Sequence, residues 1–445
     1  MKIRSSLATV IFALSIASVA SAPFCKAQAQ DDAAVPTPAE ISLHMRDLEK
    51  QVSDLRSELA AMKQSDSPTP ISPTQPGSAV PPEYLVNTAA SSPAATPVVS
   101  LASLLGPTSL SGFVDLYYGV NFNHPDSRNN GLRSFDVNTN QFGLNLVELV
   151  VDKAPDAAAS RTGYHIAMGF GQAMNAVNAT DAGGLGFAQY LKEAYFSYIA
   201  PIGKGLQVDA GKFVTPHGAE VIETKDNWNY SRGLLFSYAI PYYHFGLRAK
   251  YNFNDKYSLS GFAVNGWNNI VDNNTGKTYG ASLGWNPTKK ISFTQNYMAG
   301  PETASINGDW RQLWDTVVTV TPNSRWAVTA NYDYGRGDRV TGIPAPVYWT
   351  GIAGYVRYAP NARYALTTRY EYYNDHDGFT TGTAQHLNEV TGTFQWMMAN
   401  QILARLEFRR DMSNQPVFQE GSNKVTGQNT LTAGFVYTFD SREAK

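Results

Sequence analysis

The chain contains one cysteine among its 445 residues, and charged residues make up only 16% of it. A single cysteine cannot form an internal disulfide, so no disulfide framework holds this fold. The charged fraction is well below the roughly 25% that is usual for soluble domains, which indicates that part of the surface faces something other than water. Lysine and arginine number 35 against 37 acidic residues, and this balance argues against nucleic-acid binding.

Long apolar runs are also missing beyond the N-terminus. No stretch after residue 30 approaches the about 18 uninterrupted apolar residues of a membrane helix. Residues 1–29 have the layout of a secretory signal peptide, with Lys2 and Arg4 followed by the apolar run LATVIFALSIASVA and then small residues. We expect cleavage after Ala29, which also removes Cys25; lipoprotein processing at Cys25 is the alternative. The mature protein is therefore predicted to be exported.

The next segment has the pattern of a short coiled coil. Over residues 30–65, apolar side chains recur at alternating spacings of four and three, which predicts a periplasmic helix that self-associates. The predicted seam consists of Ile41, Met45, Leu48, Val52, Leu55, Leu59 and Met62. The alternative is a single amphipathic helix packed on its own chain. Residues 66–107 carry nine prolines and predict an extended linker to the last domain, residues 108–445.

That last domain offers sixteen segments in which every second side chain is apolar. In ILARLEFRR, for example, Leu406 and Phe408 share one face of a strand, while Glu407 and Arg409 share the other. The predicted strands cover residues 109–122, 139–152, 160–171, 187–199, 206–214, 242–254, 256–268, 276–286, 289–299, 310–321, 324–335, 346–359, 363–374, 386–397, 401–411 and 426–439.

The joints between these segments alternate in length. Pro287-Thr288 and Ala399-Asn400 are tight, whereas HPDSRNNGLRSFDVNT, GPETASING and SNQPVFQEGSNK are long and polar. Bacterial outer-membrane barrels sort their joints in this way, with short periplasmic turns and longer outer loops. We therefore predict an all-β transmembrane antiparallel β-barrel of about sixteen strands, preceded by the coiled coil. A secreted solenoid or propeller and a soluble β-sandwich are the alternatives. Aromatic residues near segment ends are candidates for interfacial girdles: Trp285, Trp310, Trp314, Trp326, Trp349, Tyr358 and Trp396.

The third long joint, about residues 215–241, fits neither the strand period nor the helix period for long. In sixteen-stranded porins the third loop folds inward and narrows the channel. We expect its apolar residues, such as Leu234 and Phe236, to pack on the inner wall, and its carboxylates to extend into the water-filled lumen. The predicted constriction residues are Glu220, Glu223, Asp226 and Arg232. An external loop or a small lid is the alternative.

Strand parity also predicts which charged side chains face the lumen, because charge at the lipid midplane is costly. These are Asp115, Glu148, Glu193 and Asp209 on early strands, and Arg248, Lys250, Arg357, Arg363, Arg369, Glu371, Glu389, Arg405, Glu407 and Arg409 on later ones. Basic groups opposite the carboxylates of the third loop would set a transverse field that selects ions. Ion pairs that only stabilise the barrel are the alternative role.

Several stretches carry a resemblance to a known family. GKFVTPHGAEVIE and NYSRGLLFSYAIPYYHFGLRAKY, with LKEAYFSY upstream and GFAVNGWN downstream, resemble the outer-membrane β-barrel porins of the OmpL-like group. The matching positions that stand out are Gly211, Gly218, Glu220, Pro241 and Gly246. The resemblance implies a barrel and passive diffusion across the outer membrane of a Gram-negative-type bacterium. It brings no binding residues to carry over.

Three functions remain open at this point. The first is a porin for passive diffusion of small hydrophilic solutes. The second is a porin selective for anions or sugars, with an aromatic track of Trp228, Tyr230, Tyr238 and Tyr242. The third is an outer-membrane tether that contacts the cell wall through the N-terminal helix. No histidine has metal-site spacing and no GxSxG motif is present, so we expect neither an enzyme nor a cofactor. The expected partners are outer-membrane lipid, the solutes and two further copies in a homotrimer.

Overall fold

The structure is a computed structural model that describes residues 106–181, 186–337 and 346–442. The predicted signal peptide, the coiled-coil helix with its seam, and all but the last two residues of the predicted linker lie outside these described residues. Within the described ranges, no helix has both the length and the apolar character needed to cross a membrane.

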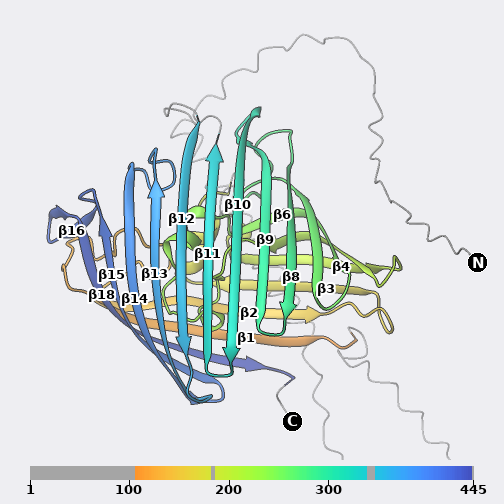
Figure 1. Ribbon diagram of the computed structural model, residues 1–445, viewed down its shortest axis with the longest axis horizontal. Helices are drawn as coiled ribbons and strands as arrows, with labels where there is room; N and C mark the ends of the chain where they lie inside the picture. The colour runs from red at the N-terminus through yellow and green to blue at the C-terminus, as the bar shows by residue number, and fades with distance from the viewer. Residues whose placement is uncertain (1–105, 182–185, 338–345, 443–445) are drawn as a thin grey trace, which may run out of the picture. The chain divides into compact units, whose positions relative to one another are not determined.

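The described chain forms a closed antiparallel barrel of sixteen strands (Figure 1). Each barrel strand pairs with its neighbours in the sequence, and the last strand, β18, closes the ring by pairing with both β15 and β1. The barrel strands are β1 (Ser109–Asn121), β2 (Gln141–Lys153), β3 (Thr162–Phe170), β4 (Leu191–Ala200), β5 (Leu206–Val214), β6 (Tyr243–Asn252), β7 (Tyr257–Val264), β8 (Thr278–Thr288), β9 (Ile291–Thr303), β10 (Ile306–Asn323), β11 (Trp326–Gly337), β12 (Val347–Tyr358), β13 (Tyr364–Asp375), β14 (Gln385–Ala399), β15 (Ile402–Ser413) and β18 (Gly427–Asp440).

All sixteen predicted strands are confirmed, and the differences lie in the joints. The predicted long loop GPETASING is wrong, because β9 and β10 continue through most of it and Thr303 pairs with Ile306 across a two-residue turn. The last long loop contains a small hairpin, β16 (Phe418–Glu420) with β17 (Asn423–Val425). The second long loop contains the helix α3 (Gln172–Asn178), which buries Met174 and Val177.

The strands are polar inside and apolar outside. Along β15, Arg405, Glu407 and Arg409 are buried, whereas Leu406 and Phe408 on the opposite face are about half exposed. Large apolar side chains stand outward on strands around the ring, and examples are Leu116, Phe142, Phe196, Leu247, Trp314, Leu366 and Phe435. An outward apolar band around a polar interior is the pattern of a barrel that sits in lipid.

Most of the predicted girdle aromatics also face outward, but Trp349 does not. Trp285, Trp310, Trp314, Trp326 and Trp396 are exposed outside the barrel. Trp349 is 1% exposed and shares the inward face of β12 with Ala353 and Tyr355, so its assignment to a girdle is wrong. Trp349 does lie near the end of a strand, but on the face of β12 that points into the barrel.

The two ends of the barrel differ. At one end, which we call the short-turn end, strands are joined by turns as short as residues 289–290, 324–325 and 400–401. The opposite end, the long-loop end, carries the first loop (122–140), the second loop (171–190) and the third loop (215–242). In outer-membrane barrels the short turns face the periplasm.

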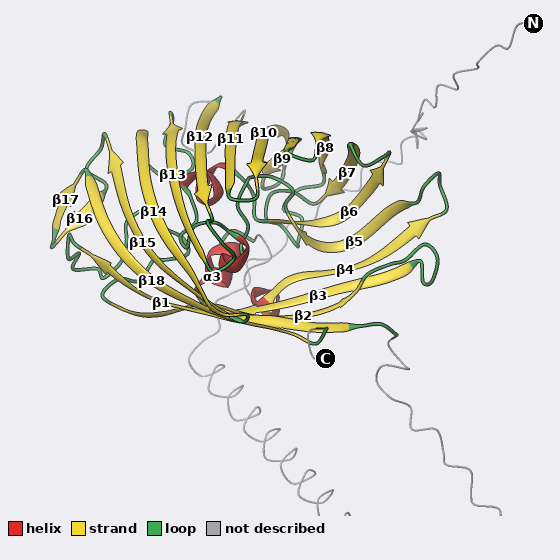
Figure 2. Cartoon of the chain, turned by 60° about the horizontal axis from the view of Figure 1, so that its bottom comes forward, coloured by secondary structure: helices red, strands yellow, loops and turns green. Residues whose placement is uncertain are grey.

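Loops and short helices lie inside the ring of strands (Figure 2). The apolar core is formed there rather than between two layers. Phe135 of the first loop, Met174 of α3 and Phe236 of the third loop pack together with inward-facing residues such as Phe113 and Phe213. Because the loops bring this apolar surface into the lumen, much of the barrel interior is filled by protein.

Candidate functional site

The third loop is attached to the inner wall of the barrel through its own backbone. The Glu371 carboxylate of β13 accepts hydrogen bonds from the backbone N–H groups of Leu234 (2.6 Å) and Leu235 (3.2 Å). The Glu407 carboxylate of β15 accepts from the N–H groups of Tyr230 (2.6 Å) and Ser231 (2.9 Å). A loop without a sheet partner needs acceptors for its buried N–H groups, and these two wall carboxylates supply them.

Two arginines of the barrel wall donate hydrogen bonds to carbonyl groups of the same loop. The Arg405 guanidinium donates to the carbonyl oxygens of Thr224 (2.6 Å) and Asn229 (3.0 Å), and also to that of Asn227. Arg369 donates to the Ser231 carbonyl at 2.7 Å and forms an ion pair with Glu220 at 2.7 Å. These charge-assisted bonds are among the stronger polar contacts that a buried segment can make.

The loop reaches other parts of the wall as well. The N–H of Gly218 donates to Asp315 of β10 at 3.0 Å, and the Trp349 indole N–H of β12 donates to the Ala239 carbonyl at 3.1 Å. On β1, Asp115 accepts from the Tyr230 hydroxyl at 2.9 Å. The loop is therefore held against strands β10 and β12 as well as against β13, β15 and β1.

A chain of ion pairs extends this attachment to the early strands. Lys192 of β4 pairs with Glu148 of β2 at 2.8 Å and also with Glu223 of the third loop. Lys192 is 2% exposed, so its charge is compensated by these carboxylates rather than by water. Strict alternation would turn Lys192 outward, because its neighbour Glu193 faces inward, so the sequence pattern carried no sign of this role. A register shift between β3 and β4 at this point lets both side chains face inward.

The four predicted constriction residues have different surroundings. Glu220 is 6% exposed and is engaged by Arg369 and the Gly233 N–H, so it does not stand free in water as the sequence analysis expected. Arg232 is buried, donates to loop carbonyls and lies 4.6 Å from the Phe135 ring. Glu223 is paired with Lys192, and Asp226 is exposed beside Lys225.

The predicted pore-lining residues face inward, but most do not meet solvent. Those with at most 4% exposure are Asp115, Glu148, Asp209, Arg369, Glu371, Glu389, Arg405, Glu407 and Arg409. Arg248 is half-buried and pairs with Asp209 at 2.8 Å, Arg357 is half-buried, and Lys250 is exposed. For Arg369 and Arg409, whose charges are paired and buried, these contacts favour the ion-pair role that the sequence left open.

The first loop adds two charged residues that the sequence analysis missed. Arg133 pairs with Glu389 at 3.0 Å and with Asp411, and Asp136 pairs with Arg409 at 2.6 Å. Burial alone raises the pKa of Asp136, but Arg409 and Arg133 more than offset it and hold that pKa below its usual value. An irregular loop gives no parity signal, so these partners were not visible in the sequence.

Two cavities lie on opposite sides of the third loop. The larger one, which we call the mouth cavity, has a volume of about 700 Å³ and is lined by residues of the first, second and third loops and by Arg311 of β10 and Trp349 of β12. The smaller one, the inner cavity, has a volume of about 150 Å³ and is lined by Asp226 and Trp228 of the loop and by Val317 of β10, among others. Along β10, the loop contact at Asp315 comes between the residues of the two cavities.

The described residues contain no group of three or more His, Cys, Asp or Glu side chains placed to hold a metal ion. Many ionisable groups inside the barrel, such as Arg369, Glu371 and Glu407, instead form ion pairs or bind the backbone of the third loop. The arrangement suits a scaffold that shapes a passage.

Comparison with solved structures shows the same fold in outer-membrane proteins. OmpT of Vibrio cholerae, in its in-vitro folded trimer form, superposes with a TM-score of 0.51 at 12% identity, over 75% of this chain and 99% of that chain. The anion-selective porin from Comamonas acidovorans superposes with a TM-score of 0.51 at 9% identity, over 75% and 99% of the two chains. Comparison with curated proteins gives no match.

The sequence itself matches one family over most of its length. The match covers residues 107–439, which includes the whole barrel except the last residue of β18. It agrees with the resemblance noted from the stretches around Gly211, Gly218 and Gly246. The chain belongs to the family described as "Putative beta-barrel porin-2, OmpL-like", and it is accordingly an outer-membrane porin whose barrel forms a transmembrane channel.

Proposed function

We propose that this porin lets small hydrophilic solutes diffuse across the outer membrane, and that its third loop narrows the passage. The observation that carries the proposal is the attachment of residues 215–242 to the inside of a closed barrel. A segment that occupies the lumen reduces the cross-section left for solutes, and the groups that line the remainder determine what passes.

The positions of the two cavities support this passage. Arg311 lines the mouth cavity and Val317 lines the inner cavity, and both lie on β10 with the loop contact at Asp315 between them. Six residues of strand span about 20 Å, so the two cavities belong to different depths of the barrel. A solute that enters at the long-loop end would meet the third loop before it reaches the inner cavity.

A cysteine placed at the loop tests the constriction. Asp226 is exposed on the third loop and lines the inner cavity. In a Cys25→Ser background, Asp226→Cys should lose single-channel conductance in planar bilayers when a bulky thiol reagent is added. Asp126→Cys, on an exposed part of the first loop that lines neither cavity, is the matched control and should keep its conductance.

Conductance that is unchanged by the reagent at Asp226→Cys would count against the constriction. A wild-type protein that inserts into the bilayer but passes no ions would count against the diffusion channel as a whole, and would favour the tethering role.

A preference for anions is a second candidate, and one observation favours it. At the short-turn end, Lys290, Arg325 and Arg357 line a common cavity of about 430 Å³, and no described carboxylate forms an ion pair with them. Lys250 faces the same end of the lumen and is also exposed. Unpaired positive charge at one mouth raises the local concentration of anions. The Comamonas porin of the same fold is named as anion-selective.

Assembly and the N-terminal region complete the proposal. We expect a homotrimer, the form named for the Vibrio cholerae structure, with residues 1–29 removed. Residues 30–65 would then lie in the periplasm, within reach of the cell wall. Analytical ultracentrifugation in detergent should show fewer copies per assembly when residues 30–107 are deleted. A variant that still has three copies means that the predicted coiled coil does not hold the trimer together.

A further inference from the structure

The mouth cavity contains a cation that forms no ion pair within the described residues, although the Glu302 carboxylate is near enough to interact with it electrostatically. The guanidinium of Arg311, on β10, makes no hydrogen bond or ion pair with any described residue. Its guanidinium carbon lies 5.1 Å from the centre of the Trp267 ring and 4.9 Å from that of Phe379. Two aromatic rings therefore fix the position of the group and leave its N–H donors available to a ligand.

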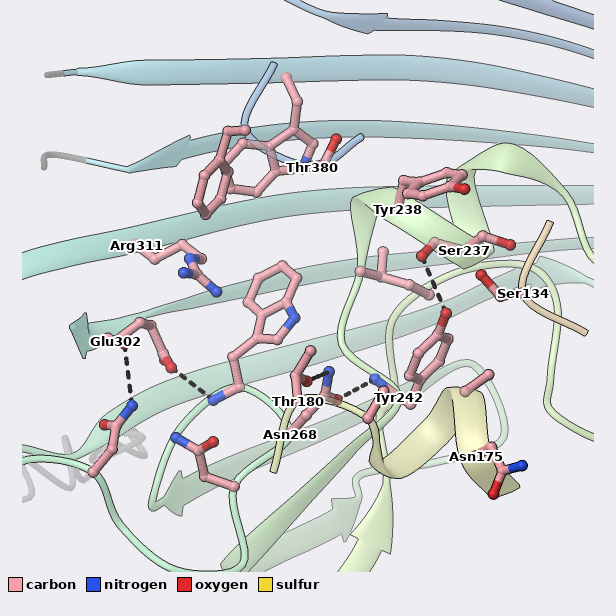
Figure 3. A pocket seen from close by; sticks show the side chains of 18 of the residues that line it. Ser134, Asn175, Thr180, Ser237, Tyr238, Tyr242, Asn268, Glu302, Arg311 and Thr380 are labelled. Carbon is pink, nitrogen blue, oxygen red and sulfur yellow. Dashed lines mark hydrogen bonds between the residues drawn. The ribbon is translucent and has the colours of Figure 1, made fainter. Parts of the chain in front are cut away.

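Glu302, the acidic residue beside Arg311 in the cavity lining, already has hydrogen-bond partners. The Glu302 carboxylate accepts from the Trp267 N–H at 2.8 Å and from the Thr278 hydroxyl at 2.7 Å. Figure 3 shows Glu302 beside Arg311, with its contacts directed toward residues 265–277, which join β7 to β8. Glu302 therefore positions Trp267, and through that ring it also positions Arg311, without forming an ion pair with the guanidinium.

Neutral polar groups lie across the cavity from the arginine. Figure 3 shows Asn175 and Tyr242 on the side opposite Arg311. The side-chain amide nitrogens of Gln172 and Asn175 on α3 donate no hydrogen bond to described residues, whereas the oxygens of both amides are engaged. A ligand that reaches this side would find amide donors next to partly exposed aromatic rings, a combination that suits hydroxyl groups on a compact carbon skeleton.

We propose that the mouth cavity binds small hydroxylated carboxylates of the sugar-acid class, with Arg311 holding the carboxylate. A guanidinium recognises a planar carboxylate through two parallel N–H donors, and it repels cations. The volume of about 700 Å³ lies within the roughly 300–1,000 Å³ of typical ligand sites. The inference deepens the proposed channel function: the site would collect such solutes at the long-loop end, above the third loop.

Tryptophan fluorescence tests the site without requiring conduction, because Trp267 contacts Arg311. The refolded full-length protein in detergent is titrated with glucuronate and, separately, with glucose. The wild type should give a saturating response to glucuronate and a much weaker response to glucose. Arg311→Gln should weaken the glucuronate response by about tenfold or more, since a charge-assisted contact is lost. Arg311→Lys should recover part of it.

Arg128→Gln provides the matched control, because Arg128 is an exposed loop arginine that does not line the cavity. Its glucuronate response should equal that of the wild type. Equal responses to glucose and glucuronate, or an Arg311→Gln variant that binds as the wild type does, would overturn the site. Conductance in potassium chloride is recorded on the same samples: a wild type that conducts but does not respond to glucuronate refutes the binding site and leaves the channel intact.

Discussion

Inside this barrel, buried ionic side chains act mainly on the backbone of the third loop. Glu371 and Glu407 accept from its N–H groups, and Arg405 donates to its carbonyls. Strand parity predicted that these side chains face inward, and they do. Parity could not predict their partners. It gives the face of the strand on which a side chain stands, but not which distant segment of the chain that side chain contacts. The sequence therefore suggested open-lumen charge where the structure has loop contacts.

Replacing Arg405 should loosen the third loop. Arg405→Gln removes the donors to the carbonyls of Thr224, Asn227 and Asn229, and each buried group left without a partner costs about 1–3 kcal/mol. We expect a lower free energy of unfolding in urea, followed by tryptophan fluorescence in detergent, and a noisier single-channel current. Arg410→Gln on the outward face of the same strand is the control and should resemble the wild type. Identical stability of the two variants would contradict the role of Arg405.

Acid should weaken the attachment of the first loop. Although burial raises the pKa of Asp136, Arg409 and Arg133 more than offset it, so the folded-state pKa lies below the unfolded one. Such a carboxylate contributes stability above its unfolded pKa, and this contribution is lost as the pH falls through the folded pKa. Asp136→Asn should therefore lower the free energy of unfolding at pH 7 and reduce its dependence on acid pH. If the free energy of unfolding changes with pH in the same way for the variant and the wild type, this account is refuted.

At the scale of elements, the strands were easier to predict than the joints. Alternation of lipid-facing and inward-facing residues extends along every strand, so ten or more residues repeat the same signal and the strand count of sixteen was recovered. The helix α3 was missed because seven residues make fewer than two full turns of apolar pattern. The hairpin of β16 and β17 was read as loop because each strand has only three residues.

Two glycines make a close pairing of β5 with its neighbours possible. Gly211 and Gly246 lie opposite each other in β5 and β6, with φ values of 137° and 157°. A Cβ at Gly211 would lie 2.1 Å from the carbonyl oxygen of Ala194. Gly211→Ala should therefore cost about 1–3 kcal/mol, the usual range for a strained backbone site. The measurement is the urea midpoint in detergent. Gly392→Ala in β14 is the control, because open space surrounds that position, and it should leave the midpoint unchanged.

At the scale of the whole molecule, the barrel has an apolar outer surface, and its interior contains both polar and apolar side chains. Side chains such as Phe142 (84% exposed) and Phe196 (62% exposed) stand outward, where lipid would surround them. The low charge content of the sequence already indicated this surface. The filling of the lumen was not predictable in the same way, because Phe135, Met174 and Phe236 come from three separate loops whose meeting depends on the closed barrel.

The unpaired charges along the passage should decide which ions it favours. Arg369 is unsuitable as a probe of selectivity, because its charge is buried and its removal would also release the third loop. Lys250 and Arg357 reach solvent near the short-turn end, so the double variant Lys250→Gln with Arg357→Gln should shift the reversal potential in a potassium chloride gradient toward cation preference. The shift should be larger at low salt, because the screening length is about 10 Å at 0.1 M and shorter above it. Arg410→Gln, on the outward face, should leave the potential unchanged. A double variant with the wild-type reversal potential at low salt would show that these two charges do not select the ions that pass.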